Sequence, residues 1–191
     1  MAEEKQEERR GLYEWVQALV CSVLAAVVVF AFAVRVVGVS GGSMRETLQN
    51  GDLLLVVNGL VCGGYEPGDV VIAAKPAFEN GEPIVKRVIA TEGQTVDIDF
   101  TLGVVYVDGQ ALEEPYIREL THLDLGTDYP FTVPEGCVFL MGDNRNESRD
   151  SREPDLGAVD VRCVIGRAVF LLLPGKTAGL QARQWDRIGA L

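Results

Sequence analysis

Two patterns predict a mainly β domain attached to one N-terminal transmembrane helix. Val16 to Val34 is an apolar run broken by only two polar residues, about the length that an α-helix needs to cross a bilayer. Beyond Val36 the chain changes to short β-branched or aliphatic runs bounded by Gly, Asp, Asn and Pro, which is typical of strands. No amphipathic helical pattern longer than a few turns interrupts these runs before Pro174. At 191 residues the chain has room for one globular domain and an appendage.

The apolar run is expected to be a retained anchor within residues 14–36. A buried core helix is unusual at this length without charges, but a cleavable signal peptide competes, because Ala31-Phe32-Ala33 is an A-x-A site. The apolar character continues past that site, which favours retention. Three basic residues precede the run closely and one follows it. This asymmetry predicts that residues 1–13 are cytoplasmic and that the rest of the chain is external.

The external domain is expected at residues 37–174. Its strand-like runs are 53–57, 70–74, 84–90, 95–100, 104–107, 131–133, 137–141 and 161–173. Asp108-Gly109 predicts a hairpin with a type I′ turn. Residues 113–129 are polar and aperiodic, which indicates a long irregular excursion. The tail, 175–191, fits either a loose helix with Trp185, Ile188 and Leu191 on one side or a frayed end.

Charge and cysteine content exclude some functions. Residues 1–35 carry five glutamates against four basic residues, so −10 of the net −11 lies on the rest of the chain. Such an acidic surface argues against a nucleic-acid partner. Cys62, Cys137 and Cys163 allow one disulfide in the domain, with partners that spacing does not determine. The chain has no C-x-x-C and no histidine cluster, so no zinc site is expected.

Ser43 and Lys86 are the candidate catalytic pair. Ser43 follows the apolar run closely, and Lys86 lies in the strand-like run Pro83-Ile84-Val85-Lys86-Arg87-Val88-Ile89. A serine nucleophile needs a base, and burial among aliphatic residues lowers a lysine pKa by disfavouring the ammonium form. These two segments alone fit a surface Lys-Arg pair on an ordinary strand equally well.

A third segment, Met141 to Arg152, is by its composition typical of a polar surface loop. Together, however, the three segments resemble bacterial type I signal peptidases, membrane-bound Ser/Lys enzymes that remove signal peptides from secreted proteins. The resemblance extends over roughly residues 12 to 174. It rests on Ser43-Met44 with Thr47-Leu48, on Lys86-Arg87-Val88-Ile89 with Glu92-Gly93, and on Gly142-Asp143-Asn144-Arg145 with Ser148, Asp150, Ser151 and Arg152. Gly51-Asp52 and Gly68-Asp69 also lie where the family has such pairs.

The resemblance implies a mainly β, partly barrel-like catalytic fold with an exposed apolar surface on the membrane. It assigns Ser43 as nucleophile, Lys86 as general base and Ser148 as the hydroxyl that orients the lysine amine. It also implies structural roles for Asp150 and Arg152, as an ion pair, and for Asp143 and Arg145. Gly41 stands where some members of the family have a second serine. Many single-anchor, Gram-positive-type members have glycine at this position, so the resemblance implies that the Ser43 backbone N–H is the main oxyanion donor.

Such an enzyme cuts after small residues in an A-x-A pattern, with the substrate held as an extended strand. Residues suited to small apolar substrate pockets are also suited to ordinary core packing; they are Val39, Met44, Leu48, Ile84 and Val85. The expected partners are signal-peptide-bearing preproteins and membrane lipid, with no nucleic acid, no metal and no cofactor. We expect a monomer in a bacterial cell membrane, crossing it once.

Glu46 departs from the family, which usually has proline at this position. Facing Lys86, a glutamate would raise the lysine pKa and keep the amine charged. This departure keeps two alternatives open: a relative specialised for one client such as a pilin precursor, and a catalytically weak assembly factor. A soluble self-cleaving repressor is disfavoured by the anchor. His122 lies outside every motif and is expected to be a surface histidine.

Overall fold

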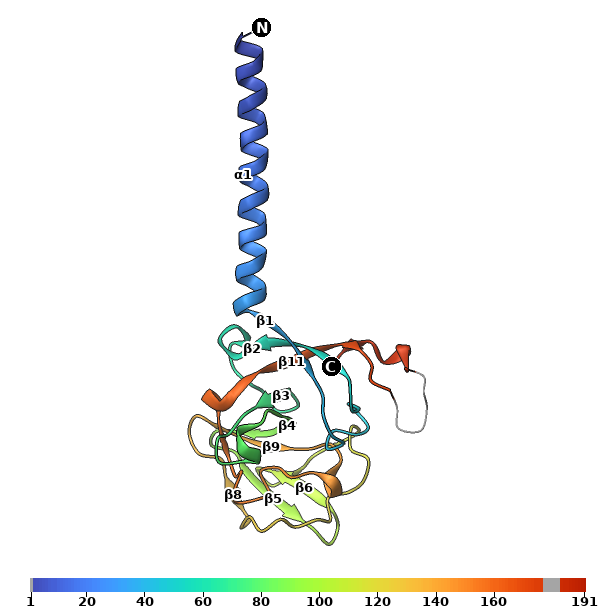
Figure 1. Cartoon of the computed structure of the whole chain (residues 1–191). Coiled ribbons are helices and arrows are strands. Elements are labelled where there is room, and N and C mark those ends of the chain that lie inside the picture. Colours follow the sequence, from blue (N-terminus) through green and yellow to red (C-terminus); the bar gives the residue numbers. More distant parts are fainter. Residues whose placement is uncertain (1, 177–182) are drawn as a thin grey trace.

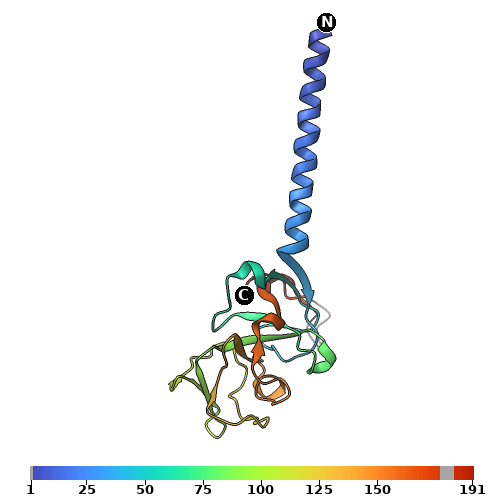
Figure 2. The ribbon, with the colours of Figure 1, turned by 90° about the vertical axis from the view of Figure 1, so that its left-hand side faces the viewer.

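The computed structural model describes residues 2–176 and 183–191. Its first element is a long helix, α1 (Ala2–Phe32), which projects from a β domain in both views (Figures 1 and 2). The stretch Tyr13–Phe32 has a mean hydropathy of 2.4, and none of it is buried. A helix that is apolar on all sides and makes no packing contact suits a bilayer better than water.

The helix ends four residues before the predicted limit of residue 36. Val34–Gly38 forms a strand, β1, and not the last turn of the helix. The cause is pairing: Val34 lies opposite Val57 and Gly38 opposite Leu53. Three β-branched valines in this strand favour the extended conformation. The apolar run continues through Ala33 to Val34, and Arg35 follows only after the strand has begun, so the composition of the run gave no sign of the junction.

Antiparallel strands make up the rest of the fold. They are β2 (Leu53–Asn58), β3 (Val70–Ala73), β4 (Ile84–Thr91), β5 (Thr95–Asp99), β6 (Val104–Val107), β7 (Gln110–Ala111), β8 (Phe131–Thr132), β9 (Cys137–Met141), β10 (Val159–Asp160), β11 (Val164–Leu173) and β12 (Gly189–Ala190). The larger sheet has the order β1-β2-β11-β3-β4-β9-β10, with β12 on β11, and the smaller has the order β7-β6-β5-β8. The mainly β, half-barrel architecture confirms the predicted fold class.

Short helical turns connect some of these strands. They are α2 (Gly59–Cys62) and 3-10 helices at Glu79–Gly81, Arg145–Glu147, Val161–Cys163 and Trp185–Arg187. Each predicted run contains a strand, although the last begins at Val164 and not at residue 161. The predicted hairpin is present, with positive φ angles of 52° at Asp108 and 76° at Gly109. Residues 113–129 contain neither helix nor strand, as expected.

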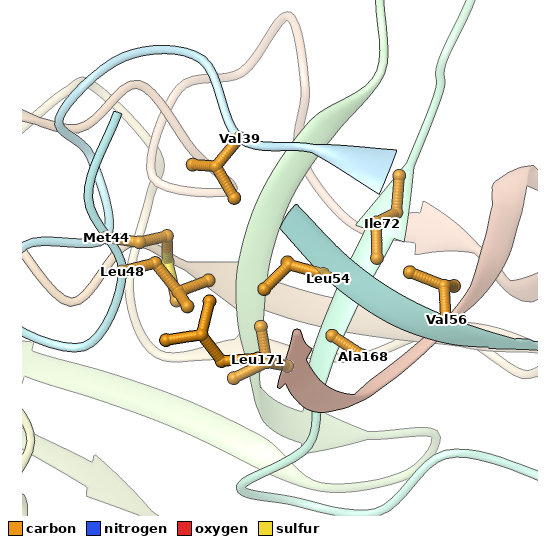
Figure 3. Packing of buried hydrophobic residues seen from close by; sticks show 9 residues of the cluster. Val39, Met44, Leu48, Leu54, Val56, Ile72, Ala168 and Leu171 are labelled. Carbon is orange, nitrogen blue, oxygen red and sulfur yellow. The ribbon is translucent and has the colours of Figure 1, made fainter. Parts of the chain in front are cut away.

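One of the three buried clusters attaches the Ser43 segment to the larger sheet (Figure 3). Met44 and Leu48 insert their side chains against Leu54 of β2 and Leu171 of β11. The second cluster lies around β3, β9 and β10, and the third fills the space between β4, β9 and the smaller sheet. The four cysteines are all free thiols.

The C-terminal tail differs from both expectations for it. Residues 183–191 contain a 3-10 turn and the strand β12, which pairs with β11 at Phe170↔Ala190 and Leu171↔Gly189. Lys176 and Arg183 form an isolated antiparallel bridge. The remaining part of the predicted helix, 177–182, lies outside the described residues. The tail therefore returns to the larger sheet, beside the segment that carries Ser43.

Candidate active site

Lys86 is positioned by the middle of a sheet. Its strand, β4, pairs with β3 on one side, where Lys86 lies opposite Val71, and with β9 on the other side from Arg87 onward. The side chain is only 4% exposed. Its Nζ donates a hydrogen bond of 2.7 Å to Ser43 Oγ. The structure thus brings together the two residues that the sequence singled out, 43 positions apart.

The environment of Lys86 lowers the pKa of its amine to about 8. Burial is the main cause, since it penalises the charged form. Asp150 opposes this effect as an anionic neighbour, while the Arg152 guanidinium reinforces it. Above about pH 8 the amine is therefore mostly neutral and able to accept a proton from the hydroxyl that it contacts.

Ser43 begins a turn that is held mainly by residues distant in the sequence. Within the turn, the Leu48 N–H donates to Met44 O at 2.7 Å. Asn144 holds the start of the turn through two donors: its backbone N–H reaches Ser43 O at 2.9 Å, and its Nδ2 reaches Gly42 O at 3.0 Å. A Cβ on Gly142 would collide with Ser43 O and with Ser148 Oγ. The absence of a side chain at Gly142 is what lets the two segments approach.

Asp150 is the centre of the loop that follows β9. Its buried carboxylate accepts hydrogen bonds from Gly142 N at 2.9 Å and from Ser148 Oγ at 2.7 Å, and it forms an ion pair with Arg152 at 2.8 Å. Both members of the pair are fully buried. The ion pair that the family resemblance implies is therefore present, and its bracing role stays a prediction. The hydrogen bond that the structure gives the Ser148 hydroxyl is to Asp150, and its orienting role toward Lys86 stays a prediction.

Asp143 and Arg145 both have ionic partners. Asp143 accepts from Arg87 at 2.7 Å and from the Thr47 hydroxyl, so it links the Ser43 turn to β4. Arg145 is fully buried and forms a two-bonded pair with Glu114, at 2.6 and 2.9 Å.

Sequence reasoning missed the partners that residues 113–129 supply. Besides Glu114, this excursion provides Thr121, whose hydroxyl accepts from Arg145 at 3.0 Å. It also provides Tyr116, whose ring lies 4.0 Å from the guanidinium carbon of Arg87. The available signal was indirect: an arginine in a motif loop that packs inside the domain requires a buried carboxylate.

The candidate substrate-pocket residues fall into two groups. Val39, Met44 and Leu48 are buried in the first core cluster, which leaves them little surface for a substrate. Ile84 and Val85 at the start of β4 are half-buried. β9 pairs with β4 only from Arg87 onward, so within the described sheet the edge beside Ile84 and Val85 has no partner strand on that side.

The remaining candidates lie at the surface. Gly41 is exposed with a positive φ of 93°, and its N–H donates to Asn50 Oδ1 at 3.0 Å. Glu46 is exposed, so it does not share the buried environment of Lys86. His122 is exposed as expected, with ring Nδ1 3.0 Å from Phe100 O.

Two cavities at the surface of the domain differ in their position relative to the Ser43–Lys86 pair. One of about 620 Å³ borders Gly41 and Gly42, next to Ser43. Another of about 720 Å³ is lined by residues such as Arg35, Leu60 and Arg162, and its lining includes neither Ser43 nor Lys86. Among residues 2–176 and 183–191, no group of three or more His, Cys, Asp or Glu side chains is placed to hold a metal ion.

Comparisons with known proteins give a consistent result. The family model described as "Signal peptidase, peptidase S26" matches residues 12–173. A signal peptidase I of Bacillus licheniformis is 37% identical over 184 residues, covering 91% of this chain and 96% of that protein. A probable signal peptidase I-1 of Synechocystis is 33% identical over 186 residues, covering 93% and 87%. A crystal structure of a signal peptidase I from Enterococcus faecalis is 29% identical, with a TM-score of 0.44, and covers 55% of this chain and 96% of that one. With a family model that spans most of its length and relatives that it matches almost end to end, this chain belongs to the signal peptidases of family S26.

Proposed function

We propose that this chain is a membrane-bound serine endopeptidase that removes signal peptides after small residues, with Ser43 as nucleophile and Lys86 as general base. Membership of the signal peptidase family supports the removal of signal peptides. The observation that carries the mechanism is the 2.7 Å hydrogen bond between Lys86 Nζ and Ser43 Oγ, made by a buried lysine whose pKa is lowered to about 8.

The reaction proceeds through an acyl-enzyme. Ser43 Oγ attacks the scissile carbonyl carbon while its proton passes to the neutral Lys86 amine. The C–N bond then breaks, and the Lys86 ammonium gives that proton to the leaving amine. A water molecule next attacks the ester carbonyl and gives a proton to Lys86. The bond between the acyl carbon and Ser43 Oγ then breaks, and Oγ takes the proton back from Lys86. The signal peptide leaves as a carboxylic acid, which gives its proton to the solvent.

Two features support the stabilisation of the charges that form. Among the residues that the structure describes, the backbone N–H of Ser43 has no acceptor, so it is available to a developing oxyanion. Gly41 adds no side chain there. Ser148 donates its hydroxyl proton to Asp150, which leaves the serine oxygen free to accept from the Lys86 ammonium. This arrangement is consistent with Ser148 as the residue that orients the amine.

The anchor and the free edge of β4 support the choice of substrate. The apolar stretch Tyr13–Phe32 would hold the enzyme in the membrane that also holds its substrates, with the N-terminus cytoplasmic and the domain outside. The unpartnered edge beside Ile84 and Val85 suits an extended peptide that adds one more strand. Glu46 is exposed, which favours an active enzyme over a catalytically weak assembly factor.

The test is cleavage of a preprotein with an A-x-A site by the full chain in detergent. We expect cutting after the final alanine, and its loss in Ser43→Ala and Lys86→Ala. His122→Ala and Lys75→Ala serve as controls; Lys75 is another lysine of the domain, bonded to Leu156 O and outside the site. Cleavage that needs His122, or none by the wild type, would refute the proposal.

A further inference from the structure

The C-terminal segment contacts the turn that carries Ser43, through one arginine. Arg187 Nη2 donates to the backbone oxygen of Thr47 at 3.1 Å. The same guanidinium forms a forked pair with Asp52, at 3.1 Å to Oδ1 and 2.6 Å to Oδ2. Its side chain is 15% exposed. Arg187 thus joins residues that are 140 and 135 positions away in the sequence.

Asp52 fixes where this arginine lies. The carboxylate is fully buried and also accepts from Gln49 N at 2.8 Å and from Gly175 N at 2.6 Å. A Cβ on Gly175 would collide with the backbone of residues 50–52, so the chain leaving β11 passes directly over the end of the Ser43 segment. Each of these bonds to a charged group is stronger than a neutral hydrogen bond.

The turn from Ser43 to Leu48 is therefore held at both ends. Asn144 binds the backbone oxygens of Gly42 and Ser43 at its start. Arg187 binds the oxygen of Thr47 at its end. Between these points the buried side chains of Met44 and Leu48 seat the turn on the core. A loss at either end therefore leaves the turn attached to the domain but lets Ser43 Oγ shift relative to Lys86 Nζ.

We propose that Arg187 is a positioning residue, which holds the Ser43–Leu48 turn so that Ser43 Oγ faces Lys86 Nζ. The inference rests on the proposed function and deepens it, because it makes the C-terminal segment part of the catalytic machinery. A displacement of about 1 Å in a reacting group costs on the order of a hundredfold in rate. Arg187 touches neither the dyad nor the free edge of β4, so its loss lowers kcat and leaves KM unchanged.

The chain contains a matched control for this pair. Asp69 of the Gly68-Asp69 pair makes the same turn as Asp52: its Oδ2 accepts from Glu66 N, and its own N–H donates to Glu66 O. Arg167 pairs with Asp69 at 3.2 Å, and that arginine is 32% exposed. Among residues 2–176 and 183–191, the Arg167 guanidinium hydrogen-bonds to Asp69 alone. Arg167→Ala therefore removes a similar ion pair without a contact to the Ser43 turn.

The first experiment measures kcat and KM for preprotein cleavage, per folded molecule, in the full chain. Arg187→Ala is expected to lower kcat about 10- to 100-fold at unchanged KM. Arg187→Lys falls between this variant and the wild type, because an ammonium cannot bind Asp52 and Thr47 O as a planar fork. Millimolar guanidinium ion is expected to restore part of the kcat of Arg187→Ala and to give no gain in wild type or Arg167→Ala.

Hydrogen exchange tests the same proposal without cleavage. In Arg187→Ala and Arg187→Lys, the Leu48 N–H, which bonds to Met44 O, loses protection, while amides of β4 keep theirs. A wild type that does not cleave while Leu48 still loses protection would refute the proposed function and leave the positioning role standing.

The positioning role is overturned by any of three results: a kcat of Arg187→Lys within about twofold of wild type, a kcat loss in Arg187→Ala no larger than in Arg167→Ala, or a Leu48 N–H whose protection is unchanged. If Arg187→Ala does not fold, Arg187→Lys decides, because it keeps a positive charge beside the buried Asp52.

Discussion

The two members of the proposed dyad, Ser43 and Lys86, are held in different ways. Lys86 lies in β4, whose backbone pairs with β3 and β9, so its position follows from sheet register. Ser43 lies in a turn held by side chains from distant segments, among them Asn144 and Arg187. Backbone ladders tolerate most side-chain changes, whereas single polar contacts do not. We therefore expect substitutions around Lys86 to act mainly on stability and substitutions around Ser43 to act mainly on rate.

Lys86→Met is expected to give the largest effect, because it changes the cleavage rate and the stability in opposite directions. We expect cleavage to fall by about a thousandfold or more, since the general base is lost. The free energy of unfolding should rise at pH 7, because a buried lysine with a pKa of about 8, against 10.5, costs on the order of 3 kcal/mol while it is protonated.

The pH dependence checks the sign of that gain. Below pH 8 both states of the wild type bind the lysine proton, so the full cost of burial is present. Between pH 8 and 10.5 the folded wild type has released a proton that the unfolded chain still binds, so wild-type stability rises and the gap to Lys86→Met closes. Chemical unfolding across this range measures it, with Ser43→Ala as the inactive control. A gap independent of pH would contradict the lowered pKa.

The next prediction concerns the loop after β9, which contacts the segments of both Ser43 and Lys86. Arg152→Met leaves the fully buried Asp150 without its partner, and breaking such a pair costs about 3–5 kcal/mol. Arg162→Met, which breaks the surface pair with Asp160, should leave stability nearly unchanged. Thermal unfolding of the two variants decides; equal losses would mean that the Asp150 pair does not brace the loop.

Two buried leucines, one in each region, allow the effects of the same substitution to be compared. Leu48 lies in the Ser43 segment and Leu140 lies in β9 opposite Val88; both are fully buried. Either change to alanine should destabilise the fold by about 2–5 kcal/mol. Only Leu48→Ala should also lower kcat per folded molecule, because its side chain seats the turn on the core. A similar kcat loss in Leu140→Ala would remove the distinction between the two regions.

The smallest effect is expected at Glu46. The kcat/KM of the wild type should rise as pH increases through about 8, since the proposed general base is the neutral form of Lys86. Glu46 is exposed, so Glu46→Gln should leave the midpoint of this rise in place. A midpoint that moves downward in the variant would show that Glu46 acts on the lysine.

The sequence predicted the two regions unequally, for a physical reason. Strand periodicity is local, so the position of Lys86 in an apolar strand was readable from its neighbours. The contacts of the Ser43 turn are long-range and ionic, and they leave no periodic pattern. Arg187 lay in a tail expected to be a loose helix or frayed, and Glu114 lay in an excursion with no readable structure. The pairing of Ser43 with Lys86 was predictable only through family resemblance.

The junction of α1 and β1 has a consequence for the way in which the proposed enzyme would reach its substrates. The helix ends at Phe32 and the strand begins at Val34, and the one residue between them, Ala33, is itself bonded to Val29 O and Asn58 N. No flexible linker separates the helix from the sheet that contains Lys86. In the proposed membrane-bound enzyme, this short junction would hold the cleavage site at a nearly constant height above the bilayer. The choice of the bond to be cut would then depend on how far a substrate extends from the membrane as well as on its residues.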